Sequence, residues 1–207
     1  MKKTQFLIVL ITIVFLLQIS AHKPIFDDET HETMETALDI KDPDVSQITY
    51  HIFTQEEPIF WVTFKGVAGD KIKVVLNIPF KKEYEDYAVH MAVIGPGIVD
   101  SLKHTVYKSF DELPFEKPEK AGVNIVDSSE YEKEYFHEPF SNTQSWFILK
   151  DHLDIPRDGR FYLAVWPGRD LDYRGRVGVS IGHLERFSPL DLFKMKDWIE
   201  GIREFHM

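Results

Sequence analysis

Stretches of alternating apolar and polar residues recur along the chain, and the clearest spans residues 71–80. There Ile72, Val74, Leu76, Ile78 and Phe80 alternate with mainly polar neighbours, which include Asn77 and are expected to face solvent. Because successive side chains of a β-strand point to opposite faces, this spacing predicts a strand with one buried face. Similar stretches, rich in β-branched and aromatic residues, lie at 48–54, 59–66, 87–93, 145–153, 160–167 and 176–184. Short strands at this spacing predict an all-β fold, an antiparallel β-sandwich domain over residues 48–186.

Residues 98–143 interrupt this pattern. The stretch is rich in Pro, Lys, Glu and Tyr, and only residues 123–126 resemble a strand. A weakly patterned segment of this length inside a compact domain is usually functional or an insertion against the sheet. We therefore expect functional residues within it.

The C-terminal residues 187–207 carry a helical pattern. Ser188 and Pro189 are typical of a helix start, as N-cap and first helical residue. Apolar residues then recur every three or four positions, at Leu192, Met195, Ile199, Ile202 and Phe205. This spacing predicts an amphipathic helix packed on the sandwich or on a partner, with docking on a membrane surface as the alternative.

The N-terminal residues 1–21 have the three parts of a signal peptide. Lys2 and Lys3 precede an apolar run over 6–17, and small residues occupy Ser20 and Ala21. The pattern predicts export, to the periplasm, the cell surface or the medium, with cleavage before His22. The alternative is an uncleaved anchor formed by residues 5–21, which would give membrane association. Residues 22–47 then form an acidic leader.

Composition narrows the classes of function. The chain has no cysteine, which excludes disulfides, thiolate metal sites and a cysteine nucleophile. Its 34 acidic against 24 basic residues give a net charge of −10 without a basic cluster, so we expect no nucleic-acid partner. Asn-x-Ser/Thr sequons are also absent, which together with the lack of disulfides favours a prokaryotic exported protein.

Several strands and turns form a set of motifs. An aromatic strand leads to Ala68-Gly69-Asp70 and an alternating strand, and Gly159, Leu163 and Val165 lie in a later strand and its preceding turn. These motifs resemble those of the pre-peptidase C-terminal (PPC) domain-like β-sandwich, in which the later strand is the closing one. The resemblance covers about 58–183 and implies a non-catalytic accessory sandwich of jelly-roll or PPC-like form. The chain also resembles a set of exported prokaryotic proteins without assigned activity that share the motifs HKP, DPDVSQ, GPG and FHEPF.

His22 is the candidate metal ligand. If cleavage leaves it at the N-terminus, its amine and imidazole could hold copper together with one further histidine, for which His137 is a candidate. No His-x-His or His-x3-His pair identifies that second ligand, and an incidental residue after the cleavage site is the simpler interpretation. Calcium at the acidic turns around Asp158 or at 170–172 is a further candidate, although these acids are also typical turn formers.

Residues 136–147, FHEPFSNTQSWF, contain the densest candidate chemistry. His137 and Glu138 lie between two phenylalanines, with Trp146 nearby, and such a group could bind a ligand or act as an acid/base pair. The same aromatics could equally pin the segment to the sheet. Phosphate-loop, dinucleotide and nucleophile-elbow motifs are absent. We therefore expect an exported, non-catalytic binding or envelope-associated module of unknown ligand, with a copper protein and a glycan- or peptide-acting hydrolase as alternatives.

Overall fold

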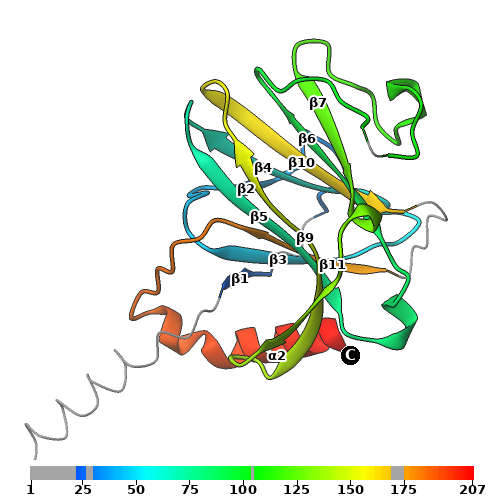
Figure 1. Ribbon diagram of the computed structural model, residues 1–207. Helices are drawn as coiled ribbons and strands as arrows, with labels where there is room; N and C mark the ends of the chain where they lie inside the picture. The colour runs from blue at the N-terminus through cyan, green and yellow to red at the C-terminus, as the bar shows by residue number, and fades with distance from the viewer. Residues whose placement is uncertain (1–21, 27–29, 104, 169–174) are drawn as a thin grey trace, which may run out of the picture.

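The computed structural model describes residues 22–26, 30–103, 105–168 and 175–207, and it consists mainly of two β-sheets (Figure 1). The predicted signal segment lies outside the described residues. One sheet has six strands and the other five. In spatial order, the six-stranded sheet contains β1 (Lys23–Ile25), β3 (Gln47–Ile52), β11 (Arg176–Ile181), β5 (Lys71–Pro79), β9 (Thr143–Asp154) and β8 (Glu134–Glu138). The five-stranded sheet contains β2 (Leu38–Ile40), β4 (Phe60–Gly66), β10 (Gly159–Pro167), β6 (Val89–Gly95) and β7 (Gly122–Asp127).

Both sheets are mixed, which corrects the expectation of a purely antiparallel fold. The long strands pair antiparallel, but β1 runs parallel to β3 and β2 runs parallel to β4. Both exceptions come from the predicted acidic leader, which adds one short edge strand to each sheet. Parallel neighbours need a crossover connection. The chain supplies it by passing from β1 to β2 in the other sheet before it returns to β3.

A single apolar cluster lies between the two sheets. The alternating residues of β5 contribute Ile72, Val74, Leu76 and Ile78, and β10 contributes Phe161, Leu163 and Val165 from the other sheet. The predicted inward face of 71–80 is therefore confirmed up to residue 78. Phe80 follows the end of β5 and is 39% exposed, with its ring 4.5 Å from that of Trp146.

A second apolar cluster covers the outer face of the five-stranded sheet. Trp61 of β4 and Trp166 of β10 are buried there beneath Phe110 and Phe115, with Tyr107 beside them. Phe110 belongs to the short 3-10 helix η2 (Phe110–Glu112). The first part of the irregular segment thus covers one sheet, and its second part supplies β7 and the unpredicted strand β8, joined by the 3-10 helix η3 (Ser128–Glu130).

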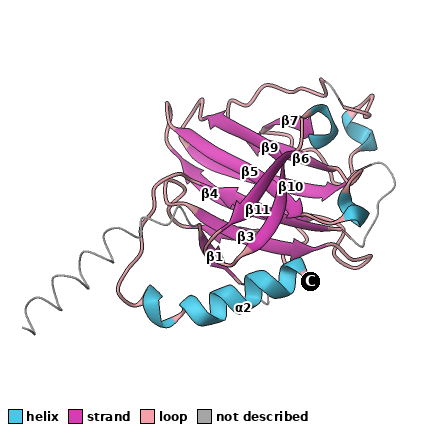
Figure 2. Cartoon of the chain, turned by 60° about the horizontal axis from the view of Figure 1, so that its bottom comes forward, coloured by secondary structure: helices cyan, strands magenta, loops and turns pink. Residues whose placement is uncertain are grey.

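The C-terminal helix α2 (Met195–His206) lies along the outer side of the six-stranded sheet (Figures 1 and 2). It begins seven residues after Ser188, and the 3-10 helix η4 (Asp191–Phe193) precedes it. Its buried face consists of Trp198, Ile202 and Phe205. The predicted apolar stripe is therefore confirmed at Ile202 and Phe205 and wrong at Leu192, which is exposed. No helix in the described ranges is long and apolar enough to cross a membrane.

Candidate functional site

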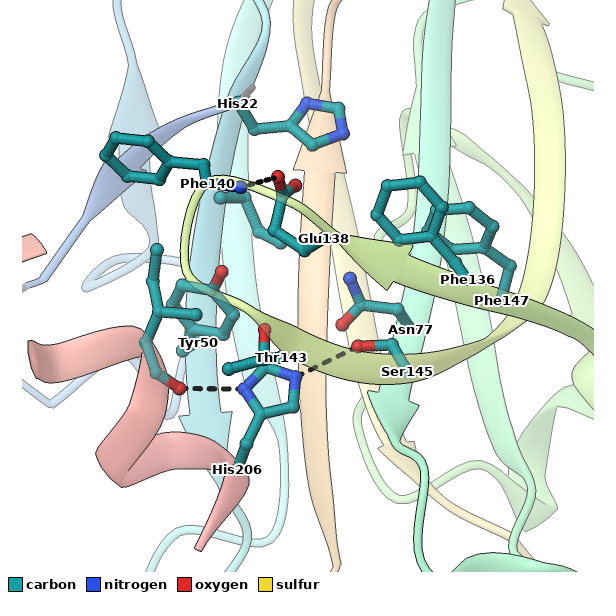
Figure 3. A pocket seen from close by; sticks show the side chains of 12 residues that line it. His22, Tyr50, Asn77, Phe136, Glu138, Phe140, Thr143, Ser145, Phe147 and His206 are labelled. Carbon is teal, nitrogen blue, oxygen red and sulfur yellow. Dashed lines mark hydrogen bonds between the residues drawn. The ribbon is translucent and has the colours of Figure 1, made fainter. Parts of the chain in front are cut away.

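A small pocket lies where α2, β1 and the β8–β9 hairpin meet over the outer face of the six-stranded sheet (Figure 3). We call it the helix pocket. Its floor is one row of neighbouring residues across four strands, because Gly178 of β11 is the register partner of both Tyr50 and Asn77, and Asn77 is the partner of Phe147. Gly178 has no side chain, and the amide of Asn77 lies over it.

Asn77 is the most confined polar group of the helix pocket. Its side chain is 6% exposed, and among the described residues its Oδ1 has no hydrogen-bond partner. Buried polar groups are normally hydrogen-bonded, and an unsatisfied one costs about 1–3 kcal/mol. Sequence analysis placed Asn77 on the solvent face of its strand. The face is instead covered by the helix and the hairpin, which no local pattern could indicate.

His22 and Glu138 lie at one end of the helix pocket (Figure 3). The Nδ1 of His22 is 2.5 Å from Ser46 Oγ. Burial, together with the positive charge of Lys73, lowers the pKa of His22 to about 4, so the ring is neutral at pH 7. Burial raises the pKa of Glu138, although its carboxylate accepts a hydrogen bond from the backbone N–H of Phe140 at 3.0 Å.

His206 occupies the other end of the helix pocket. Its Nδ1 donates to the Ile202 carbonyl at 2.7 Å, and its Nε2 accepts from the Ser145 hydroxyl at 2.9 Å, which assigns the neutral Nδ1–H tautomer. Burial lowers the pKa of His206, and the charges of Lys81 and Arg176 act in the same direction.

The predicted pair of His137 and Glu138 is not brought together. Neighbouring side chains of a strand point to opposite faces, so Glu138 lines the helix pocket while His137 is exposed and its Nε2 lies 2.9 Å from Asn142 Oδ1. Trp146 also faces away from the helix pocket, toward the inner core, where it contacts Phe80. Of the three predicted ligand-binding residues, Glu138 alone lines the helix pocket.

The size of the helix pocket limits what it can hold. Its volume of about 20 Å³ has room for a water molecule or a small ion. No group of three or more His, Asp or Glu side chains in the described ranges could hold a metal ion. Of the predicted calcium sites, Asp158 accepts a hydrogen bond from the backbone of Ala68, as a turn residue does, and 170–172 lies outside the described residues.

A larger and more open cleft lies at the edges of the two sheets, between β7 and β9. We call it the edge cleft, and its volume is about 450 Å³. Strand β8 pairs with β9 only as far as Phe147, so the rest of β9, including Asp151, lies beyond it. The backbone of Ser101 bonds to Val123 and Ile125 and so continues the edge of β7. All the lining residues except Asp151 belong to the irregular segment, namely Ser101, Lys103, 124–127, Glu130 and Tyr131.

The edge cleft is mainly acidic. Asp127, Glu130 and Asp151 line it together with a single cation, Lys103. The ring of Tyr131 is 38% exposed, and burial together with the charge of Asp151 raises the pKa of its hydroxyl. Such a surface favours a ligand with a positively charged group and an apolar part that can cover the ring.

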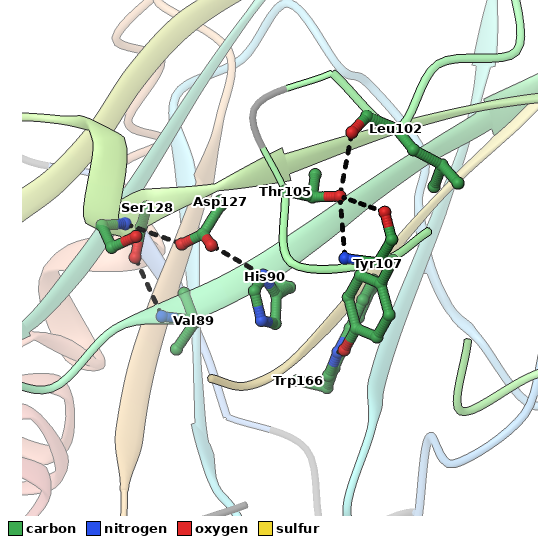
Figure 4. Close-up of polar contacts among 9 residues, drawn as sticks. Val89, His90, Leu102, Thr105, Tyr107, Asp127, Ser128 and Trp166 are labelled. Atoms are coloured by element: carbon green, nitrogen blue, oxygen red, sulfur yellow. Dashed lines mark hydrogen bonds and ion pairs between the residues drawn. The ribbon is translucent and has the colours of Figure 1, made fainter. Parts of the chain in front are cut away.

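A network of polar contacts fixes the base of the edge cleft (Figure 4). The carboxylate of Asp127 lies 3.6 Å from Nδ1 of His90 and accepts the backbone N–H of Ser129 at 2.9 Å. The Ser128 hydroxyl accepts the backbone N–H of Val89 at 2.8 Å, so it is committed to the β6 backbone rather than to a substrate. Asp127 is therefore held rigidly at the cleft wall.

The covering segment is tied down on the same side of the sheet. Trp166 donates its indole N–H to the Tyr107 hydroxyl at 2.7 Å, and Thr105 Oγ1 donates to the Leu102 carbonyl at 2.9 Å (Figure 4). Sequence analysis expected function in residues 98–143 but selected only His137 and Glu138. Asp127 and Glu130 are close in sequence, but Asp151 comes from a different strand, and the spacing of the three acids carries no motif.

No protein-family model matches this chain, and no curated protein matches it.

Proposed function

We propose that this protein is an exported, non-catalytic β-sandwich of the jelly-roll or PPC-like type that binds a small cationic ligand in the edge cleft. The observation that carries this proposal is the volume of the edge cleft, about 450 Å³, which falls within the usual range for small-molecule sites. The helix pocket, at about 20 Å³, is far below that range.

The chemistry of the edge cleft supports the same class of ligand. Asp127, Glu130 and Asp151 line it from β7, η3 and β9, and Tyr131 offers an aromatic surface. Asp127 is buried and fixed, whereas Glu130 is exposed and can adapt to the ligand. A rigid acid beside an adaptable one suits an ammonium or guanidinium group, as in a polyamine or a basic peptide.

Titration with spermidine and with trilysine, followed by amide chemical shifts, tests the proposal. We expect shifts centred on residues 124–131 and Asp151. Asp151→Asn should weaken binding by about three- to tenfold, since it removes one partly screened ion pair. Asp154→Asn is the matched control, because Asp154 lies on the same strand but outside the cleft. Shifts elsewhere, or equal effects of both variants, would contradict the proposal.

Export is a separate part of the proposal, supported by the charged, apolar and small residues of the first 21 positions. The intact mass of the protein recovered outside the cytoplasm tests it. A chain that begins at His22 supports cleavage, and a full-length chain in the membrane fraction supports an anchor. Recovery of the chain in the cytoplasm alone would contradict export.

A copper protein is the second candidate, and one observation favours it. His22 and His206 line the helix pocket from its opposite ends, so copper held by the N-terminal amine, the His22 imidazole and His206 would require the two rings to approach each other. His206 replaces His137 as the expected partner. Copper titration of the processed protein should give tight binding that both His22→Ala and His206→Ala weaken. Binding unaffected by either substitution would exclude this site.

A further inference from the structure

A group of four large apolar side chains is exposed in the segment that precedes α2. They lie within residues 187–193, which we call the apolar loop, and their exposed fractions are 45% for Phe187, 71% for Leu190, 59% for Leu192 and 84% for Phe193. Single exposed apolar residues are ordinary, but four in seven positions form a concentrated patch. Because α2 packs on the sheet through its own buried face, it leaves these four side chains uncovered.

The local structure holds the apolar loop in this arrangement. Asp191 is 4% exposed, accepts the backbone N–H of Ser188 at 2.7 Å and forms an ion pair with Lys23 at 3.1 Å. The one acid of the loop therefore points inward while its apolar neighbours point outward. This is the reverse of what the hydrophobic effect gives in water, so the geometry points to an apolar environment for the loop.

The ion pair between Lys23 and Asp191 also places the apolar loop beside the start of β1, which follows the N-terminal residues 1–21 in the chain. The apolar run over residues 6–17 ends six residues before Lys23. Six residues span at most about 20 Å, at roughly 3.3–3.6 Å per residue. If the N-terminal residues stay uncleaved and anchor the chain in a bilayer, which is the alternative to cleavage before His22, the apolar loop lies within reach of the same bilayer surface.

We propose that the apolar loop inserts into the surface of a phospholipid bilayer, beside the point where the N-terminal segment enters it. Leucine and phenylalanine side chains next to lysines, here Lys194 and Lys196, are typical of interfacial segments. The net charge of −10 opposes attraction to anionic lipids, so insertion relies on the apolar side chains. Neutral phosphatidylcholine is therefore sufficient, and the insertion persists at high salt.

Site-specific fluorescence on the full chain tests this proposal. The natural chain has no cysteine, so Phe193→Cys and Val99→Cys each give a single labelling site for an environment-sensitive dye. Val99 is the control, because it is 79% exposed and lies in the loop after β6. In phosphatidylcholine vesicles, the label at 193 should lose emission to nitroxide-bearing lipids and resist aqueous iodide. The label at 99 should behave in the opposite way.

A second substitution tests whether the apolar side chains themselves cause insertion. Leu190→Ser combined with Leu192→Ser should make the label at 193 accessible to iodide while the thermal unfolding temperature stays nearly unchanged, since both side chains are exposed. Iodide access at 193 equal to that at 99 in the unmodified loop would overturn the proposal. Protection at 193 from both quenchers would also overturn it, because protein, either the N-terminal segment or a second copy, would then cover the loop.

Discussion

Gly178 decides the shape of the helix pocket, because a Cβ atom at this position would lie 2.2 Å from Oδ1 of Asn77. We therefore predict that Gly178→Ala forces the Asn77 amide to move and lowers the free energy of unfolding by about 1–3 kcal/mol, as overpacking does. Chemical denaturation measures the effect.

The control for this prediction is a double-mutant cycle with Asn77→Ala. In that background the clash is absent, so the cost of Gly178→Ala should fall by about 1 kcal/mol or more. An unchanged cost would mean that a different neighbour of Gly178 opposes the added methyl group.

His22 makes stability depend on pH at the acidic end. Its pKa of about 4 in the folded protein lies below the ordinary value of 6.5, because burial and Lys73 disfavour the charged ring. Between these two values the unfolded chain binds more protons at His22, so stability falls as the pH drops through that window. We predict that the His22 contribution to the free energy of unfolding falls by about 1–2 kcal/mol from pH 7 to pH 4. This value is smaller than the full pKa difference would give, because the ring is partly exposed to solvent.

Denaturation of a His22→Gln variant across pH 4–7 measures this contribution. Its pH dependence should be shallower than that of the natural chain, and His137→Gln, at an exposed position, is the control for the substitution itself. Equal slopes for all three proteins would contradict the role of His22.

At the scale of elements, α2 is held by a few buried contacts with the six-stranded sheet. The ring of Phe205 lies 4.6 Å from that of Tyr50, and Arg203 donates from Nε to the Ser141 carbonyl at 2.9 Å. Phe205→Ala should lower the free energy of unfolding by about 3–5 kcal/mol and expose the amides of α2 to hydrogen exchange.

Leu192→Ala is the matched comparison for α2, because Leu192 is 59% exposed. It should change the free energy of unfolding by no more than about 0.5 kcal/mol. Sequence analysis assigned both residues to one apolar stripe. The stripe was wrong at Leu192, since the helix begins at Met195 and residues 191–193 form a separate 3-10 turn.

At the scale of the whole molecule, the core shared by both sheets couples their stabilities. Leu76 of the six-stranded sheet and Leu163 of the five-stranded sheet are each buried in that one cluster. We predict a single unfolding transition in calorimetry. Each of Leu76→Ala and Leu163→Ala should lower the free energy of unfolding by about 2–5 kcal/mol and move this one transition to a lower temperature. Two separate transitions, each moved by one variant, would show that the sheets unfold independently.

The sequence alone determined the strands that alternate, and export stays a prediction. A period of two is a local property, so the strand over 71–79 and the inward face of its apolar residues followed from composition and spacing. The sequence also predicts functional residues within 98–143, because a long segment without a strand or helix pattern is uncommon in a compact domain unless it is functional.

Only the tertiary structure decided which polar residues share a site. Register places Tyr50, Gly178 and Asn77 in one row, although they are far apart in the chain, and α2 then covers that row. His137 and Glu138 point to opposite faces of their strand, so they lie apart although they are neighbours in sequence. Asp127 and Asp151 line one cleft although they come from strands of different sheets. Such proximity arises from long-range strand pairing and packing, and a local pattern carries no information about which distant strand will be the neighbour.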